Sequence, residues 1–285
     1  MDVIIVSQWG SGIMKKIAVQ NLSLIITEQC TLQCAHCLRG SCSNRVMSDE
    51  VINATFDQIK TVGNLCICGG EPTLALDRLE KIIDVIIEKK VLVDAISIVI
   101  NGTRYEGKFL ELLKYFEDDV YSVGRKKKIL FSISWDQYHH DEVRRLNMLK
   151  EYAENVMKYS ESKYFYQLNE MKGKIFREGR AALLDENLTT PLIVMNNIIS
   201  YVGKYGMEDR ENGLCNIGPM VSVNTQGIIT DCNASYDNQE TIYNYGNVLT
   251  DSIEEVLLNN CIIVKPSKFY KALGKEIKHY HNFNK

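Results

Sequence analysis

Short apolar runs alternate with longer amphipathic segments along most of this chain, and this alternation restricts the folds open to it. Apolar residues at helical spacing predict helices between the runs, and Ser48 can cap a helix that begins with Asp49 and Glu50. The alternation predicts parallel β/α units with right-handed crossovers. Six such units suit an open, partial (β/α)6 barrel of the TIM type, followed by a smaller α/β region. The predicted strands are Leu22–Thr27, Leu65–Cys68, Ala95–Ile100, Ile129–Ser134, Tyr164–Leu168 and Leu192–Met195, and further predicted helices are Asp77–Lys89, Lys108–Phe116 and Asp141–Tyr159.

Composition argues against several classes of function. The chain has 285 residues, of which 45% are apolar and 24% are charged, as in ordinary globular proteins. Its net charge of −3 gives no electrostatic reason to expect a nucleic-acid partner. No apolar stretch reaches the roughly 18 residues that a membrane span requires, so we expect no membrane partner. Nine cysteines without an export signal predict a reducing compartment, the cytoplasm.

Three cysteines stand within a short segment directly after the first predicted strand. Cys30, Cys34 and Cys37 have the spacing C-x3-C-x2-C. Three thiolates can hold three irons of a [4Fe–4S] cluster and leave the fourth iron open, as metal sites that perform chemistry do. A disulfide framework is a weaker interpretation, because a chain of this length needs no such staples. Structural zinc is also weaker, because it needs a fourth ligand and His36 beside Cys37 is expected to point away.

The cysteine spacing resembles the signature of the radical S-adenosylmethionine (radical SAM) enzymes. The resemblance implies that the open iron chelates the amino and carboxylate groups of S-adenosyl-L-methionine (SAM). It further implies that one electron from the [4Fe–4S] cluster cleaves SAM and yields a 5′-deoxyadenosyl radical. An electron donor such as flavodoxin or ferredoxin is then required. On this resemblance the catalytic and metal-binding residues are Cys30, Cys34 and Cys37.

Further segments resemble motifs by which this family binds SAM. Residues 69–72 resemble the G-G-E-P motif, which holds the amino group of the cofactor. Residues 101–103 resemble its T-N-G turn, although Ile100 replaces the threonine, and an ordinary strand-ending turn is an equal alternative. Residues 132–136 resemble its S-x-D segment. Residues 179–181 resemble its G-R-A segment, whose arginine pairs with the SAM carboxylate unless it is simply a surface arginine. The implied cofactor-binding residues are His36, near the adenine, with Gly69, Gly70, Glu71, Pro72, Asn101, Ser134 and Arg180.

Four side chains after the fourth predicted strand are candidates for the substrate side of the site: Asp136, Tyr138, His139 and His140. In barrels of this kind the active site lies on the loops that follow the strands. The two histidines can bind substrate or move protons near neutral pH. They can equally well begin the helix that follows, and the sequence leaves both interpretations open.

The pattern changes after about residue 200, so we expect residues 15–200 to form the barrel, 205–262 a second region and 263–285 a basic tail. Two apolar runs that flank residues 224–227 predict a β-hairpin. The spacing of Cys215, Gly227 and Cys232 resembles the opening of SPASM and twitch domains, which bind auxiliary iron–sulfur clusters. Only Cys261 follows, which is too few ligands for a complete cluster. We therefore expect no auxiliary cluster; if one exists, these three cysteines are its ligands.

The resemblance fixes the reaction class more closely than the substrate. The G-R-A segment and the SPASM-like opening imply a peptide substrate from which the radical abstracts hydrogen. A small metabolite such as a nucleoside or a sugar is the alternative. A third interpretation, a non-catalytic redox or regulatory iron–sulfur protein, is disfavoured by the SAM-binding motifs, because a passive cluster needs no clamp for an amino acid.

Overall fold

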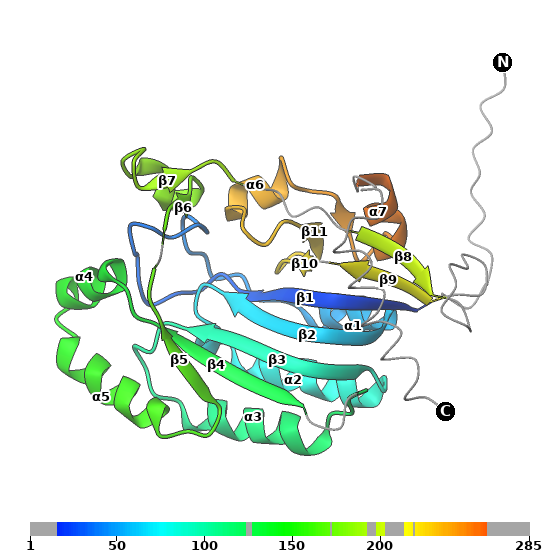
Figure 1. Ribbon diagram of the computed structural model, residues 1–285, viewed down its shortest axis with the longest axis horizontal. Helices are drawn as coiled ribbons and strands as arrows, with labels where there is room; N and C mark the ends of the chain where they lie inside the picture. Colours follow the sequence, from blue (N-terminus) through cyan, green and yellow to red (C-terminus); the bar gives the residue numbers. More distant parts are fainter. Residues whose placement is uncertain are drawn as a thin grey trace.

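The centre of the molecule is one mixed β-sheet (Figure 1). The computed structural model describes residues 16–123, 127–171, 173–192, 198–202, 214–218 and 220–260. Five strands pair in parallel and in chain order, as successive β/α units require. They are β1 (Ile17–Thr27), β2 (Ile59–Gly69), β3 (Leu92–Ile100), β4 (Lys128–Ser134) and β5 (Phe165–Asn169).

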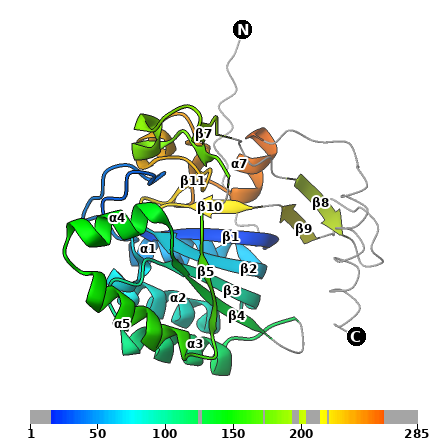
Figure 2. The same ribbon diagram turned by 60° about the vertical axis from the view of Figure 1, so that its left-hand side comes forward.

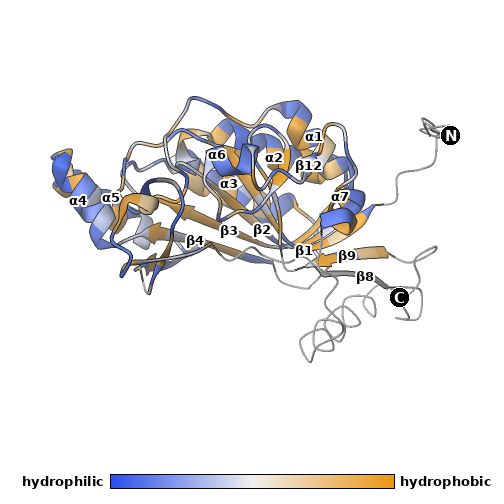
Figure 3. Cartoon of the chain, turned by 90° about the horizontal axis from the view of Figure 1, so that it is seen from above, coloured by the Kyte–Doolittle hydropathy of each residue, from blue (hydrophilic) through white to orange (hydrophobic). Residues whose placement is uncertain are grey.

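Helices connect these strands and bury one face of the sheet. Neighbouring apolar residues such as Leu24, Ile67, Ile98 and Phe131 form a cross-strand row and are fully buried on that face. The hydropathy colouring in Figure 3 shows the apolar strands and the polar outer surfaces of the helices. The helices are α1 (Asp49–Asp57), α2 (Leu76–Glu88), α3 (Gly107–Asp119), α4 (Gln137–Arg145) and α5 (Leu149–Ser160).

The C-terminal part continues the same sheet on the other side of β1. Strands β9 (Leu214–Gly218) and β10 (Val221–Val223) both pair in parallel with β1. Strand β10 forms the expected hairpin with β11 (Ile228–Thr230), and Gly227 in its turn has a φ of +81°, which glycine adopts without strain. The remaining elements are β8 (Ile198–Val202), α6 (Tyr236–Glu240), β12 (Gly246–Asn247) and α7 (Ile253–Asn260).

Small polar side chains line the second face of the sheet, which we call the inner face. In the register of the strands, Ser23 is the neighbour of Cys66 on β2 and of Ser222 on β10. Cys66 in turn neighbours Ser97, and Ser222 neighbours Thr230. We call these five residues the polar row. Because successive side chains of a strand point to opposite faces, the polar row lies opposite the buried apolar core.

The α/β class with a mostly parallel sheet of partial-barrel type is confirmed, with some corrections of detail. Ser48 caps α1 as expected, since its side chain accepts a hydrogen bond from the Val51 N–H. The single helix predicted over Asp141–Tyr159 is wrong, because Asn147 adopts a φ of +57° and separates α4 from α5. The predicted strand Leu192–Met195 lies almost entirely outside the described residues, and so does the tail.

Two short segments complete the connections near the site. Strands β6 (Ile175–Phe176) and β7 (Thr189–Thr190) form a separate small sheet, and a 3₁₀ helix, Gly179–Leu183, lies between them in the sequence. A second 3₁₀ helix, Pro72–Leu74, follows β2. Among the described residues, no helix is long and apolar enough to cross a membrane.

Candidate active site

The loop of residues 28–48 between β1 and α1, here called the cysteine loop, carries Cys30, Cys34 and Cys37. It leaves the carboxyl end of β1 and lies between α4 and the β6–β7 segment (Figures 1 and 2). Leu32 is buried in the core, and the Cys37 N–H donates to the Cys34 carbonyl at 3.1 Å. The three thiols therefore sit on a short, internally bonded loop at the edge where parallel strands place active sites.

The two glycines of the G-G-E-P segment let its backbone lie directly against the cysteine loop. The Gly70 N–H donates to the Thr27 carbonyl at 2.8 Å, and the Glu71 N–H donates to the Gln29 carbonyl at 2.7 Å. A Cβ at Gly69 would overlap the Thr27 carbonyl, and one at Gly70 would overlap the Gln29 carbonyl. The sequence assigned these glycines to a cofactor-binding motif; the contacts that the structure gives them are with the end of β1 and the start of the cysteine loop.

The Glu71 carboxylate joins the G-G-E-P segment to the turn after β3. Glu71 is 1% exposed, and its carboxylate accepts a hydrogen bond from the Asn101 N–H at 2.6 Å. It also accepts two from Thr73, one from the backbone N–H at 3.0 Å and one from the hydroxyl at 2.6 Å. Burial raises the pKa of Glu71, although these donors oppose the rise. The carboxylate thus holds two SAM-motif segments together, with Pro72 as the first residue of the 3₁₀ helix that follows.

Asn101 connects that turn to the first cysteine. Its Nδ2 lies 3.8 Å from the Cys30 Sγ and 3.0 Å from the Thr31 Oγ1, while its Oδ1 accepts from Thr103. Gly102 has a φ of +71°, which explains the glycine in this turn. Hydrogen bonds donated to the sulfur atoms are one means by which proteins set the reduction potential of iron–sulfur clusters.

Arg180 binds the G-R-A segment to the cysteine loop through hydrogen bonds. Its backbone N–H donates to the Cys37 carbonyl at 3.0 Å, its Nε donates to the Cys34 carbonyl at 2.9 Å, and its Nη1 donates to the Gly40 carbonyl. A Cβ at Gly179 would overlap the Leu38 carbonyl, so the glycine before the arginine is also required by close backbone contact. The structure therefore brings a residue from far along the chain onto the loop that carries the cysteines.

Asp136 organises the side chains at the start of α4. It caps the helix by accepting from the His139 N–H at 3.1 Å, and its Oδ2 lies 2.8 Å from His139 Nδ1 and 3.6 Å from His36 Nε2. The neighbouring imidazoles hold the pKa of Asp136 below its usual value despite burial. Of the residues proposed to face substrate, Asp136 and His139 therefore bond to each other within the described chain.

His36, which the resemblance places near the adenine, packs among aromatic rings. It stacks on Tyr138 with ring centroids 4.7 Å apart, and it meets His139 edge-on at 5.0 Å. Burial lowers the pKa of His36 to about 4, so the ring is neutral at physiological pH. His140 points elsewhere and contacts Trp135 edge-on at 4.5 Å.

Ser134 ends β4 close to this group. Its carbonyl accepts a hydrogen bond from the Tyr152 hydroxyl at 2.7 Å, and its side chain is partly exposed. Helix α4 itself is tied to the cysteine loop, since Glu142 accepts from the Gln33 N–H at 3.0 Å. Four segments, after β2, β3, β4 and β6, thus converge on one loop.

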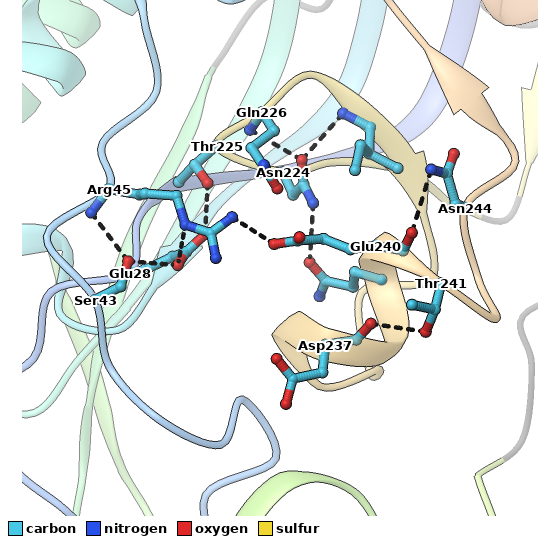
Figure 4. A network of polar contacts seen from close by, with 12 residues as sticks. Glu28, Ser43, Arg45, Asn224, Thr225, Gln226, Asp237, Glu240, Thr241 and Asn244 are labelled. Carbon is cyan, nitrogen blue, oxygen red and sulfur yellow. Dashed lines mark hydrogen bonds and ion pairs between the residues drawn. The ribbon is translucent and has the colours of Figure 1, made fainter.

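Sequence reasoning missed a network that joins the cysteine loop to the C-terminal hairpin (Figure 4). The buried Glu28 accepts from the Ser43 hydroxyl at 2.7 Å and from the Thr225 hydroxyl at 2.6 Å, and it pairs with Arg45 at 3.1 Å. Arg45 also pairs with Glu240 of α6. The available signal for this network was a glutamate directly after an apolar strand, because a buried carboxylate needs hydrogen-bond partners.

Cys42 was also missed as a neighbour of the motif. It forms a hydrogen bond with Cys30 that raises the pKa of Cys30 and lowers the pKa of Cys42. Both cysteines line a cavity of about 390 Å³, together with Gln29, Ser43, Asn44 and Leu74. Space for a ligand therefore exists directly beside the first cysteine of the motif.

The cysteines of the SPASM-like spacing lie apart in the fold. Cys215 is buried in the core on β9. The next residue, Asn216, pairs with Ala18 near the start of β1. Cys232 Sγ contacts Met220 Sδ at 3.1 Å, just before β10, and burial raises the pKa of Cys232 to about 12. Cys261 lies outside the described residues. The existence of an auxiliary cluster stays a prediction to be tested by iron content.

The donor set of the cysteine loop fits an iron–sulfur cluster. It offers three thiols on one loop, and an amide aimed at one of them. Burial raises the pKa of Cys34 to about 12, a cost that a bound metal removes because it ligates the thiolate. The Cys34 Sγ and one ring nitrogen each of His36 and His139 also lie within 4.8 Å of one another, which makes these three residues a second candidate set of metal ligands.

Comparison with known proteins identifies the class. Residues 24–158, which span the cysteine loop and strands β2 to β4, match the Radical SAM superfamily. Residues 24–158 therefore form a radical SAM domain, and the cofactors of that superfamily are a [4Fe–4S] cluster and SAM. The match ends before the C-terminal region, so the SPASM/twitch resemblance stays a prediction. A search of curated proteins finds no match.

Two solved structures illustrate how distant the similar proteins are. The chain is 16% identical to anSMEcpe with bound AdoMet and Cp18Cys peptide, covering 84% of this chain and 80% of that one, with a TM-score of 0.42. It is 12% identical to Streptococcus suis SuiB bound to precursor peptide SuiA, covering 89% of this chain and 66% of that one, with a TM-score of 0.36.

Proposed function

We propose that this radical SAM enzyme abstracts hydrogen from a peptide substrate and so modifies that peptide. The observation that carries the proposal is the docking of the G-R-A segment on the cysteine loop through Arg180. The sequence resemblance to peptide-modifying enzymes rests on this segment together with the SPASM-like opening. The bonds of Arg180 to the Cys34 and Cys37 carbonyls place the segment beside the proposed cluster ligands.

The shape of the inner face is compatible with an extended substrate. The side chains of Val99 and Leu130 on this face are 41% and 36% exposed, beside the polar row. Among the described residues, β5 has a strand neighbour on one side alone. A peptide can lie across such an open, partly apolar surface, whereas a small metabolite leaves most of it uncovered.

The residues of the chain would bind and orient the cofactors. Cys30, Cys34 and Cys37 would hold the cluster, which supplies the electron for reductive cleavage of SAM when both are bound. We propose that Glu71 and Arg180 lie at the two charged ends of the methionyl group, with Asn101 and Ser134 nearby. His36 and Tyr138 would exclude water around the adenine, because both rings are packed together and His36 is neutral.

The test compares substrate classes with the reconstituted enzyme. Anaerobic protein with cluster, SAM and dithionite is incubated either with a peptide encoded beside its gene or with a panel of nucleosides and sugars. We expect 5′-deoxyadenosine to form in step with a mass change in the peptide. Turnover of a nucleoside or sugar without change in the peptide would favour the metabolite alternative instead.

The proposal also includes an electron donor and a compartment. A flavodoxin or ferredoxin would replace dithionite, and the reducing cytoplasm suits a chain with nine cysteines whose described members form no disulfide. Replacement of dithionite by reduced flavodoxin should sustain 5′-deoxyadenosine formation, and failure with both carrier types would remove this part of the proposal.

A further inference from the structure

We propose that Arg39 binds a carboxylate of the substrate at the inner face of the sheet. This inference rests on the proposed function in that a substrate must enter there, but it names a residue and a ligand chemistry that the cofactor motifs do not include. Arg39 follows the last cysteine of the motif by two residues, and its partner Cys68 directly precedes the G-G-E-P segment. A group held between them lies next to both cofactor-binding segments.

Among the described residues, the guanidinium of Arg39 has no carboxylate partner. Its Nη1 donates to the Ala234 carbonyl at 3.0 Å, and its Nη2 lies 3.8 Å from the Cys68 Sγ. It is partly buried, yet it forms no ion pair within the described part of the chain. Guanidinium groups carry five N–H donors, and charges removed from water are normally paired. The other described arginines, apart from Arg180, each pair with a carboxylate; they are Arg45, Arg78, Arg104, Arg144, Arg145 and Arg177.

The surroundings of Arg39 supply further donors. The buried hydroxyls of Tyr236, Ser222 and Thr230 have no hydrogen-bond partner among the described residues. The Tyr236 N–H donates to the Arg39 carbonyl at 3.1 Å, so the two residues are adjacent. Ser222 and Thr230 belong to the polar row. Cys68 connects Arg39 to this row, because its Sγ contacts the Arg39 guanidinium and lies 3.3 Å from the Oγ of Ser23, a member of the row. Buried hydroxyls without partners are costly, and a ligand that accepts from them removes that cost.

A carboxylate is the ligand that suits this group of donors. Its two oxygens match the planar fork of a guanidinium and accept from hydroxyls as well. The carboxylate of Glu178 is used elsewhere, since it accepts from the Ser235 N–H at 2.9 Å and from Asn238 Nδ2 at 2.8 Å. In a peptide substrate the carboxylate would come from an acidic side chain or from the C-terminus.

Two alkylating reagents of nearly equal size probe this assignment at Cys68. Iodoacetate carries a carboxylate and iodoacetamide a neutral amide. Both form a C–S bond as the thiolate displaces iodide, which leaves with the electron pair of the C–I bond. The ratio of the two rates at one thiol therefore cancels the thiol's pKa. The protein is used with its cluster and SAM bound, and the labelled peptides are quantified by mass spectrometry.

We expect the iodoacetate-to-iodoacetamide ratio at Cys68 to fall roughly tenfold in Arg39→Gln, as loss of a charge-assisted hydrogen bond predicts. Arg39→Lys should retain part of the ratio, and Arg78→Gln, a surface change on α2, should leave it unaltered. In the wild-type protein, acetate should protect Cys68 from iodoacetamide, whereas acetamide should not. This second measurement needs no variant and holds even if Arg39→Gln fails to fold.

Three results would overturn the inference: an unchanged ratio in Arg39→Gln, no labelling of Cys68 by either reagent, or weakened SAM binding in Arg39→Gln, which would assign Arg39 to the cofactor. The outcome is separable from that of the proposed function. A peptide that is modified while the ratio is insensitive to Arg39 refutes this inference alone. A ratio that depends on Arg39 while no peptide is modified refutes the proposed function alone. With a modified peptide in hand, amidation of its C-terminus and Glu-to-Gln changes distinguish the two sources of the carboxylate.

Discussion

The Thr225 hydroxyl donates a 2.6 Å hydrogen bond to the Glu28 carboxylate, although the two residues are 197 positions apart in the sequence. Glu28 begins the cysteine loop, and Thr225 lies in the turn of the β10–β11 hairpin (Figure 4). The bond therefore couples the C-terminal region to the loop that carries the three cysteines of the motif. Because Glu28 is buried, the geometry of the hairpin and of the cysteine loop depend on one another.

Thr225→Val should destabilise the protein, because it leaves a buried carboxylate without one of its donors. The expected loss is about 1–3 kcal/mol of unfolding free energy. Urea unfolding followed by circular dichroism measures it. Thr241→Val is the matched control, since the exposed Thr241 hydroxyl, just after α6, donates to the Asp237 carbonyl in that helix. Equal losses in both variants would show that the contact with Glu28 contributes nothing particular.

Replacement of Cys30, Cys34 and Cys37 together by alanine should remove the cluster. We expect loss of bound iron, of the visible absorbance of the iron–sulfur centre and of 5′-deoxyadenosine formation, because these thiolates are the expected iron ligands. Cys66→Ala, on β2 and away from the cysteine loop, serves as the control for iron content. SAM cleavage by the triple variant would rule out the assignment of the ligands.

Gly70→Ala should disrupt the site far more than Gly107→Ala. A Cβ at Gly70 overlaps the Gln29 carbonyl in the cysteine loop, whereas a Cβ at Gly107, at the start of α3, meets nothing within 4 Å. We expect a loss of roughly 1–3 kcal/mol for Gly70→Ala, as overpacking costs, and a change near zero or a small gain for Gly107→Ala. Unfolding free energies and iron content after reconstitution are the measurements. Similar values for both would mean that the loop yields to the added methyl group.

Glu71→Ala and Arg180→Ala should each weaken SAM binding by roughly tenfold or more, the equivalent of one lost charge-assisted bond. Calorimetric titration of the cluster-loaded protein with SAM measures the change. Arg177→Ala is a close control, because Arg177 lies three residues before Arg180 and pairs with the exposed Glu186. Unchanged affinity in both variants would refute the proposed contacts with the methionyl group.

The reconstituted protein should hold about four irons per chain, the content of one cluster. Cys232→Ala should lower stability modestly, as truncation of a small buried side chain does, and leave the iron content unchanged. Iron and sulfide assays decide the matter. A content near eight that falls to about four when Cys215 and Cys232 are both replaced would establish an auxiliary cluster.

Local sequence determined the elements and the motif segments of this protein. Helical and strand periodicity, a capping serine and turn glycines act over a few residues, so β1 to β5, α1 to α3 and the β10–β11 hairpin could be predicted from the chain alone. The cysteine spacing is local as well, and it pointed correctly to the radical SAM class. The break between α4 and α5 at Asn147 was not predicted, because apolar spacing continues across it.

Only the tertiary structure decided which of these segments meet. Sequence periodicity does not encode that β9 and β10 pair with β1, that Arg180 bonds to the Cys34 carbonyl, or that Glu28 meets Thr225. Such contacts join residues far apart in the chain, and they form because buried polar groups must find partners once the sheet is assembled. The motifs therefore named the chemistry of the site, while long-range pairing of strands and buried polar groups set its geometry.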